Sequence, residues 1–443
     1  MELSVDALEV IYNYLDDDTD RLNFRKMCRA TIRFTQIVTS LHTLETMQKY
    51  NKCIFTHLKA TCKQDLMHLH VTRLTCNNLQ LTELPDMPQL IELNCNYNNL
   101  TQLPYMPLLK NLYCTGNQLT QLPDMLLLRK LYCRDNRLTH LPYMPQLIEL
   151  YCVNNQLTQL QDMPQLIELN CNHNRLAHLP NILLLKELYC IDNLLTYLPD
   201  MPQLTKLYCS DNQLTQLPYM PQLTELYCYN NRLTQLPDMS HLIKLNCNHN
   251  RLIQLPDMSL LKELYCCDNQ LTQLPDMPQL VVLNCCDNQL TQLPYMLQLK
   301  ELYCTNNRLT QLPDMSQLIK LNCYTNQLTQ LPDMPLLTEL NCYSNQLTQL
   351  PNIPQLTILQ CGGNRLTQLP DMPLLTRLYC TNNQLTQLPN TPLLLILHCN
   401  SNLLTQLLDM PLLIELYCAR NWLIQLPNTP RLIVLQCDDY LNE

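Results

Sequence analysis

Glycine is nearly absent from this chain, which has three glycines in 443 residues. A chain of average composition and this length would hold about 30. Gly116, Gly362 and Gly363 cannot compose the GxxxxGK loop of P-loop proteins or the GxGxxG turn of dinucleotide-binding folds. The composition therefore excludes both of these nucleotide-binding classes, and we expect no cofactor.

Long apolar runs and a basic excess are also missing. A membrane helix needs about 18 consecutive apolar residues, and no uninterrupted apolar segment of the chain approaches this length. Residues 1–20 also lack the basic and apolar regions of a signal peptide. The formal charge of −9 opposes binding to nucleic-acid phosphates. We expect a soluble, intracellular, cytoplasmic protein that binds neither membrane nor nucleic acid. The odd total of 25 cysteines also disfavours a secreted or surface receptor.

The dominant feature of the chain is a cysteine at every nineteenth position from Cys76 to Cys437. Around each of these cysteines the unit reads LxxLxCxxNxLTxLPxMPx, and the Leu and Cys two residues apart would project from one face of a short strand. A single unit cannot bury such a face, so copies should stack as a parallel sheet. The pattern resembles a leucine-rich repeat with Cys in the third apolar place. It also resembles the short repeats of bacterial LPX effectors.

This resemblance implies a leucine-rich-repeat solenoid of the α/β-horseshoe class over residues 69–443, with about 20 repeats of 19 residues. The parallel β-sheet would line its concave side. All 30 prolines fall in the outer segment of the unit, which predicts an extended or polyproline-like convex side without outer helices. We expect the repeated cysteines to be buried and free, acting as small apolar side chains rather than metal ligands. The repeated Asn, from Asn98 to Asn421, should bond to backbone groups at the bend and to the next turn.

The first part of the chain has a different composition, because all three Phe and no Pro precede residue 69. Apolar residues over Leu8–Leu15 recur with a helical period, which predicts a small all-α domain. The segment resembles an F-box at Leu3, Asp6, Leu8, Ile11, Tyr14, Leu15, Asp20, Cys28 and Arg29.

An F-box resemblance implies docking to a Skp-type adaptor and, through it, to a cullin-RING ubiquitin ligase. The adaptor-binding residues would then be Leu3, Leu8, Ile11, Leu15, Leu22, Cys28 and Arg29. We assign residues 1–35 to this F-box-like domain and residues 36–68 to a helical linker and N-terminal cap. The alternative is that all of these helices only cover the open apolar end of the solenoid.

The concave face is the predicted site of target binding, because its side chains stand in rows on a rigid sheet. Tyrosine offers a large contact area at a low entropic cost, although such a row could also be a self-stacking ladder. The row consists of Tyr113, Tyr132, Tyr151, Tyr189, Tyr208, Tyr227, Tyr265, Tyr303, Tyr379 and Tyr417.

Charged residues are expected in two places, beside the tyrosine row and on the outer edge of the solenoid. Glu and Lys alternate beside the tyrosines, which favours local ion pairs. An acidic, solvated outer edge is expected at Asp86, Asp124, Asp200, Asp238, Asp276 and Asp314. Cys267 and Cys286 are expected on the concave side as adjacent exposed thiols, with no His nearby at the spacing of a metal site.

No nucleophile, base and orienting group converge in the pattern, so we do not expect an enzyme. The sequence predicts a protein–protein interaction module that serves as the substrate-recognition subunit of an SCF-type ubiquitin ligase. The alternative is a non-enzymatic scaffold or effector that binds a host protein. Chains that combine an F-box with short repeats of this kind resemble predicted proteins of giant DNA viruses, in which case the adaptor and the ligase would belong to a host.

Overall fold

The computed structural model describes residues 72–84 and 86–438. The predicted F-box-like domain and the linker to residue 68 lie outside these residues and stay predictions. The chain divides into two compact units, one ending at Leu166 and the other beginning at Ile167.

Every repeat in the described residues contributes one strand of three residues. In the first unit the strands are β1 (Arg73–Thr75), β2 (Glu92–Asn94), β3 (Asn111–Tyr113), β4 (Lys130–Tyr132) and β5 (Glu149–Tyr151). In the second unit they are β6 (Glu168–Asn170), β7 (Glu187–Tyr189), β8 (Lys206–Tyr208), β9 (Glu225–Tyr227), β10 (Lys244–Asn246), β11 (Glu263–Tyr265), β12 (Val282–Asn284), β13 (Glu301–Tyr303), β14 (Lys320–Asn322), β15 (Glu339–Asn341), β16 (Ile358–Gln360), β17 (Arg377–Tyr379), β18 (Ile396–His398), β19 (Glu415–Tyr417) and β20 (Val434–Gln436).

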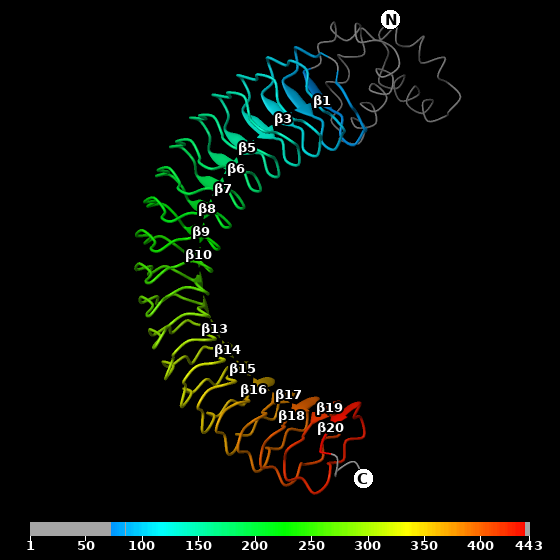
Figure 1. Cartoon of the computed structure of the whole chain (residues 1–443), viewed down its shortest axis with the longest axis vertical. Helices are drawn as coiled ribbons and strands as arrows, with labels where there is room; N and C mark the ends of the chain where they lie inside the picture. The colour runs from blue at the N-terminus through cyan, green and yellow to red at the C-terminus, as the bar shows by residue number, and fades with distance from the viewer. Residues whose placement is uncertain (1–71, 85, 439–443) are drawn as a thin grey trace, which may run out of the picture. The chain divides into compact units, whose positions relative to one another are not determined.

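Consecutive strands within each unit pair in parallel, and residues 19 positions apart lie opposite each other, as Leu93 lies opposite Leu112. The same register holds in the second unit, where Leu207 lies opposite Leu226. The strands occupy one side of each coil and the proline-containing segments return along the other side (Figure 1). The predicted parallel-sheet solenoid is therefore confirmed within each unit.

The core of each turn is built from the repeated apolar positions. In the second repeat Leu93, Cys95 and Leu100 are 0% exposed, and the equivalent positions of later turns are closely similar except in the last turn, where Leu435 is 40% exposed. Full burial of each such leucine stabilises the fold by about 1.5–3 kcal/mol. The described cysteines of this repeated position are free, and those from Cys76 to Cys418 are buried. Their predicted role as small apolar core side chains is confirmed.

The proline-containing segment ends in a tight turn that leads into the next strand, as it does before β3. The Leu109 amide donates a 3.2 Å hydrogen bond to the Met106 carbonyl, with Pro107 in the second position of the turn, where its fixed φ is favourable. No residue within 72–84 and 86–438 is helical, which agrees with the predicted lack of outer helices. Accordingly, no helix in that part of the chain is long and apolar enough to cross a membrane.

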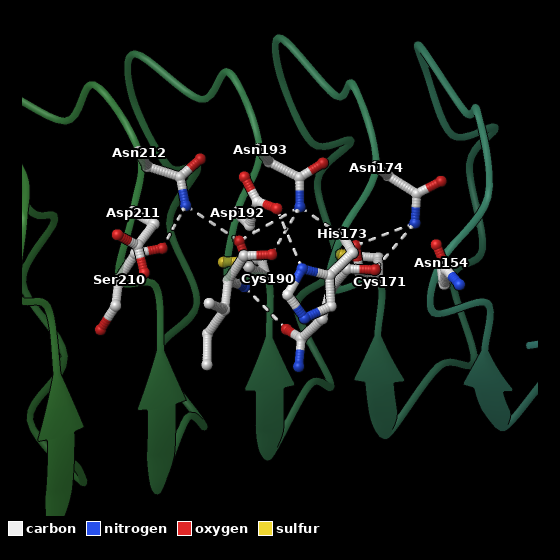
Figure 2. Close-up of polar contacts among 12 residues, drawn as sticks. Asn154, Cys171, His173, Asn174, Cys190, Asp192, Asn193, Ser210, Asp211 and Asn212 are labelled. Atoms are coloured by element: carbon white, nitrogen blue, oxygen red, sulfur yellow. Dashed lines mark hydrogen bonds and ion pairs between the residues drawn. The ribbon is translucent and has the colours of Figure 1, made fainter. Parts of the chain in front are cut away.

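The repeated asparagine closes each turn by hydrogen bonding to the backbone (Figure 2). The Asn193 Nδ2 donates to the carbonyls of Cys171, at 3.0 Å, and Cys190, at 3.2 Å. Its Oδ1 accepts from the Leu176 amide at 3.0 Å. Cys171 and Leu176 belong to the preceding turn, so one buried side chain satisfies backbone groups on two turns. The predicted bonding to backbone groups at the bend is confirmed, whereas the predicted bond to the next turn is wrong, because the Asn193 side chain bonds to the preceding turn.

The residue before each repeated asparagine has a left-handed backbone. Asn154 has a φ of 54° and His173 of 55°, while Gly116 and Gly363 adopt 68° and 63° at equivalent positions. Among other side chains, Asn and Asp tolerate this conformation best because they bond locally. About half of these turns use Asn or Asp, which helps to explain how a chain with three glycines makes so many tight bends.

Candidate protein-interaction face

The strand face consists of the first and third residues of each strand, which flank a central leucine that is buried in β1–β19. In β8, Lys206 and Tyr208 flank Leu207, and both are partly exposed while Leu207 is 0% exposed. Within the unit that begins at Ile167, the strands lie along the inner side of its bend (Figure 1). The strand face of this unit is therefore the predicted concave side.

In the first unit, three of the predicted tyrosines form a continuous stack. The Tyr113 and Tyr132 rings lie 5.0 Å apart between centroids, at an interplanar angle of 25°. Tyr132 and Tyr151 are 4.6 Å apart at 6°. These distances lie within the range of favourable stacking between aromatic rings.

The second unit begins with an equivalent stack. Tyr189 and Tyr208 are 4.7 Å apart at 17°, and Tyr208 and Tyr227 are 4.7 Å apart at 5°. Because in-register residues of neighbouring strands are about 4.8 Å apart, the sheet spacing itself places the rings at the stacking distance. The alternative interpretation as a self-stacking ladder is thus confirmed for both triplets, and the rings still stand partly in solvent.

The remaining tyrosines do not continue these stacks. Tyr265 lies between Asn246 and Asn284 in the register of the sheet. Tyr303 has the same setting, since Asn284 and Asn322 lie opposite it on the two neighbouring strands. The predicted row is therefore divided into separate clusters.

Near the C-terminal end of the described chain, a histidine joins two of the predicted tyrosines. The His398 ring lies 4.7 Å from Tyr379 and 4.2 Å from Tyr417. Burial lowers the pKa of His398, and the nearby Glu415 carboxylate opposes this shift to a smaller extent. An uncharged imidazole between two tyrosines extends the aromatic surface. Sequence analysis missed His398, although the residue lies 19 positions after Tyr379 and 19 before Tyr417 and could have been found from that spacing.

Tyrosine hydroxyls on the strand face bond to glutamates. The Tyr132 hydroxyl donates to Glu149 at 2.9 Å, and the Tyr208 hydroxyl donates to Glu225 at 2.8 Å. Burial raises the pKa of Tyr208 above its ordinary value, and the hydrogen bond to Glu225 adds to the shift. The Tyr208 hydroxyl therefore stays protonated, and the two hydrogen bonds hold the rings in fixed orientations.

Lysines of the strand face pair with glutamates on neighbouring strands. Lys130 contacts Glu149 at 2.7 Å in the first unit. The second unit has three further pairs, at distances of 3.0 Å for Lys206–Glu187, 3.0 Å for Lys244–Glu263 and 3.5 Å for Lys320–Glu339. Exposed pairs of this kind contribute about 0–1 kcal/mol each to stability. The prediction of local pairing is confirmed for these four pairs.

The acidic outer edge is also found as predicted, since its six aspartates are exposed. These are Asp86, Asp124, Asp200, Asp238, Asp276 and Asp314.

The prediction for Cys267 and Cys286 needs a correction. Cys267 is 9% exposed and Cys286 is of intermediate exposure, so neither is the open surface thiol that was expected. The Asn284 side chain covers Cys267, accepting a hydrogen bond from its Sγ at 2.8 Å. Among the described residues, no three His, Cys, Asp or Glu side chains are grouped so that they could hold a metal ion.

The residues that the F-box resemblance assigns to adaptor binding lie outside the described residues. They are Leu3, Leu8, Ile11, Leu15, Leu22, Cys28 and Arg29. Their assignment stays a prediction.

Comparison with known proteins identifies relatives of this fold. No protein-family model matches the chain, and no curated protein matches it either. YopM from Yersinia enterocolitica is similar at 31% sequence identity, over 88% of this chain and 99% of YopM, with a TM-score of 0.75. A leucine-rich-repeat protein of Leptospira interrogans is 25% identical over 73% of this chain and 94% of its own, with a TM-score of 0.53. The plant peptide hormone receptor RGFR1, solved in complex with RGF2, shares the fold at 18% identity, covering 84% of this chain and 83% of the receptor chain, with a TM-score of 0.61.

Proposed function

The chain belongs to the leucine-rich-repeat proteins, and on that premise we propose that its strand face is a protein-binding surface. The observation that carries the proposal is the pair of tyrosine stacks, one in each unit. Tyrosine is enriched at protein interfaces because a rigid, amphipathic ring buries a large area with little loss of conformational freedom.

The contacts around the stacks favour binding because they fix the rings before a partner arrives. Tyr208 is stacked on both sides and bonded to Glu225. A side chain that is already immobilised loses less entropy on association. The neighbouring Lys206 is paired with Glu187, so a partner need not neutralise an isolated charge at this place. Self-stacking and recognition are thus compatible roles for the same residues.

The proposal is tested by comparing two sets of tyrosine substitutions in the full chain. The first combines Tyr189→Ala, Tyr208→Ala and Tyr227→Ala on the strand face. The matched control combines Tyr219→Ala and Tyr295→Ala, which lie on the proline-containing segments and are 63% and 72% exposed. Proteins captured from a eukaryotic cell extract are quantified by mass spectrometry. We expect the strand-face variant to lose partners that the control retains, whereas equal retention by both variants would contradict the proposal.

We further infer a more specific role from the F-box resemblance of residues 1–35. In this role the segment docks a Skp-type adaptor in the cytoplasm, a cullin-RING ligase assembles on it, and the strand face holds the protein to be ubiquitylated. The adaptor would be that of a host if the chain is viral. The support is the residue pattern at Leu8, Ile11 and Tyr14–Leu15, followed by Cys28–Arg29. The alternative role is a scaffold or effector whose first helices only cap the repeats.

A purified Skp-type adaptor distinguishes these two roles. The full chain should bind the adaptor, and the double variant Leu8→Asp with Ile11→Asp should not, while its far-UV circular dichroism matches that of the parent. The variant with three strand-face alanines is the control, because it should lose its target and keep the adaptor. If folded full chain fails to bind the adaptor, the ligase role is wrong and the capped scaffold remains.

A further inference from the structure

The cysteines that recur every 19 residues from Cys76 to Cys437 are called the ladder cysteines. Two cysteines outside this ladder lie beside each other at one edge of the strand face. Cys267 and Cys286 each follow a ladder cysteine and come two residues after the ends of β11 and β12. The two strands pair in register, with Tyr265 opposite Asn284, so the two cysteines are also neighbours. In-register residues of adjacent strands are about 4.8 Å apart, which lies within the Cα separation that disulfides span.

This pair of neighbouring thiols is specific to one place in the solenoid. The equivalent position holds Ser210 and Thr305 in nearby turns, and no other turn of residues 72–438 has a cysteine there. Cys286 retains some exposure, whereas the adjacent ladder cysteines Cys266 and Cys285 are 0% exposed. A small reagent in solution can therefore reach Cys286 but not the ladder.

The two thiols have different chemical settings. Hydrogen bonding from the Cys267 thiol, and then from Thr305, lowers the pKa of Cys286 to about 7 despite its partial burial. The same bond and burial raise the pKa of Cys267. The single Cys267 S–H proton can reach either Cys286 or the Asn284 Oδ1, which is 2.8 Å away. Cys286 is thus the more acidic of the two thiols, and Cys267 is the proton donor beside it.

We propose that Cys286 and Cys267 form a thiol modification site that reacts with a low-molecular-weight disulfide and closes into a Cys267–Cys286 disulfide. The Cys286 thiolate attacks one sulfur of the disulfide RSSR, a mixed disulfide forms, and RS⁻ leaves. The Cys267 sulfur then gives up its proton and attacks the Cys286 sulfur, which releases the second RS⁻. Two protein thiols are oxidised, and one RSSR is reduced to two RSH. This site is independent of the proposed binding function.

Oxidised glutathione is the probe for the test, added to the folded full chain at neutral pH. Trypsin should release residues 263–300 as one peptide, because no Lys or Arg lies between Lys262 and Lys300, and this peptide holds all four neighbouring cysteines. We expect the peptide to lose two hydrogens, with two reduced glutathiones released per chain. Fragmentation should place the bond between Cys267 and Cys286.

Two serine variants separate the roles of the two thiols. Serine occurs at the equivalent Ser210, so both variants should fold, which circular dichroism verifies. Cys267→Ser should stop at a mixed disulfide on Cys286, and Cys286→Ser should react at least about tenfold more slowly than the parent. The proposal is overturned if Cys286→Ser reacts at the parental rate, if the parent accumulates only the mixed disulfide, or if ladder cysteines such as Cys304 are modified first.

Discussion

The Tyr208 hydroxyl donates a 2.8 Å hydrogen bond to the Glu225 carboxylate on the next strand. The same Tyr208 ring stacks on Tyr189 and Tyr227, at 4.7 Å in each case. One side chain therefore links three consecutive turns through its ring and fixes a carboxylate through its hydroxyl. The sheet spacing produces the stack, and the glutamate of the next turn orients it.

Substitutions of Tyr208 should separate the contributions of ring and hydroxyl. Tyr208→Phe removes one partly exposed hydrogen bond and should cost about 0.5–1.5 kcal/mol. Tyr208→Ala also removes two stacks, at about 0.5–1.5 kcal/mol each, and should be clearly less stable than Tyr208→Phe. Urea denaturation monitored by circular dichroism checks the order. Equal stability of the two variants would show that the stack contributes nothing measurable.

Replacing the buried Asn193 should destabilise the protein more than the loss of a small side chain would suggest. Asn193→Ala leaves the Leu176 amide without its partner, and an unsatisfied buried group costs about 1–3 kcal/mol. The Cys171 carbonyl loses one of its two hydrogen bonds and keeps the one from Asn174. We expect faster hydrogen exchange at the Leu176 amide and a lower unfolding midpoint. Gln216→Ala is the control, because Gln216 is exposed and surface changes usually stay within about 0.5 kcal/mol. Unchanged protection of Leu176 would contradict this account of the turn.

The period of the repeat was sufficient to predict the strands and the core, because these follow from local alternation. Leu93 and Cys95 are two residues apart in the chain and necessarily point to the same side of a strand. Stacking behaves differently, since it depends on which residue stands 19 positions away. Tyr208 has ring neighbours, whereas Tyr265 lies between asparagines in the same register. The asparagines at this register position divide the row of tyrosines into clusters, which the pattern of a single repeat does not predict.

Other features depended on contacts that no single unit reveals. Cys267 is covered by Asn284, which comes from the next turn, and so a position that alternation places in solvent is nearly buried. His398 completes an aromatic cluster only because Tyr379 and Tyr417 lie on both sides of it. The predicted F-box at Leu8 and Ile11 rests on the residue pattern alone and awaits the adaptor experiment.

Substitutions at the left-handed residue of each turn should change the stability of the protein according to how well the new side chain tolerates a positive φ. Asn382 has a φ of 55°, and its amide donates to the Asn400 carbonyl at 3.0 Å. Asn382→Val should cost about 1–2 kcal/mol, because a branched side chain is disfavoured in this conformation. Asn382→Gly should be close to neutral, since Gly363 holds the same position one turn earlier. Thermal unfolding of the two variants tests this, and a valine variant as stable as the glycine variant would contradict it.

The reactivity of Cys286 towards iodoacetamide should follow pH in a defined direction. Only the thiolate reacts, and because the hydrogen bond from Cys267 lowers the pKa of Cys286 to about 7, the rate should reach half its maximum near that pH. Below that pH the rate should fall about tenfold per unit, and above about pH 8 it should level off. Burial raises the pKa of Cys380 to about 12, so this ladder thiol should stay unmodified throughout. Cys267→Ala removes the hydrogen-bond donor, so the midpoint of the pH profile should move towards about 8.5, the pKa of an unperturbed cysteine. A midpoint that does not move would show that Cys267 does not control the charge of Cys286.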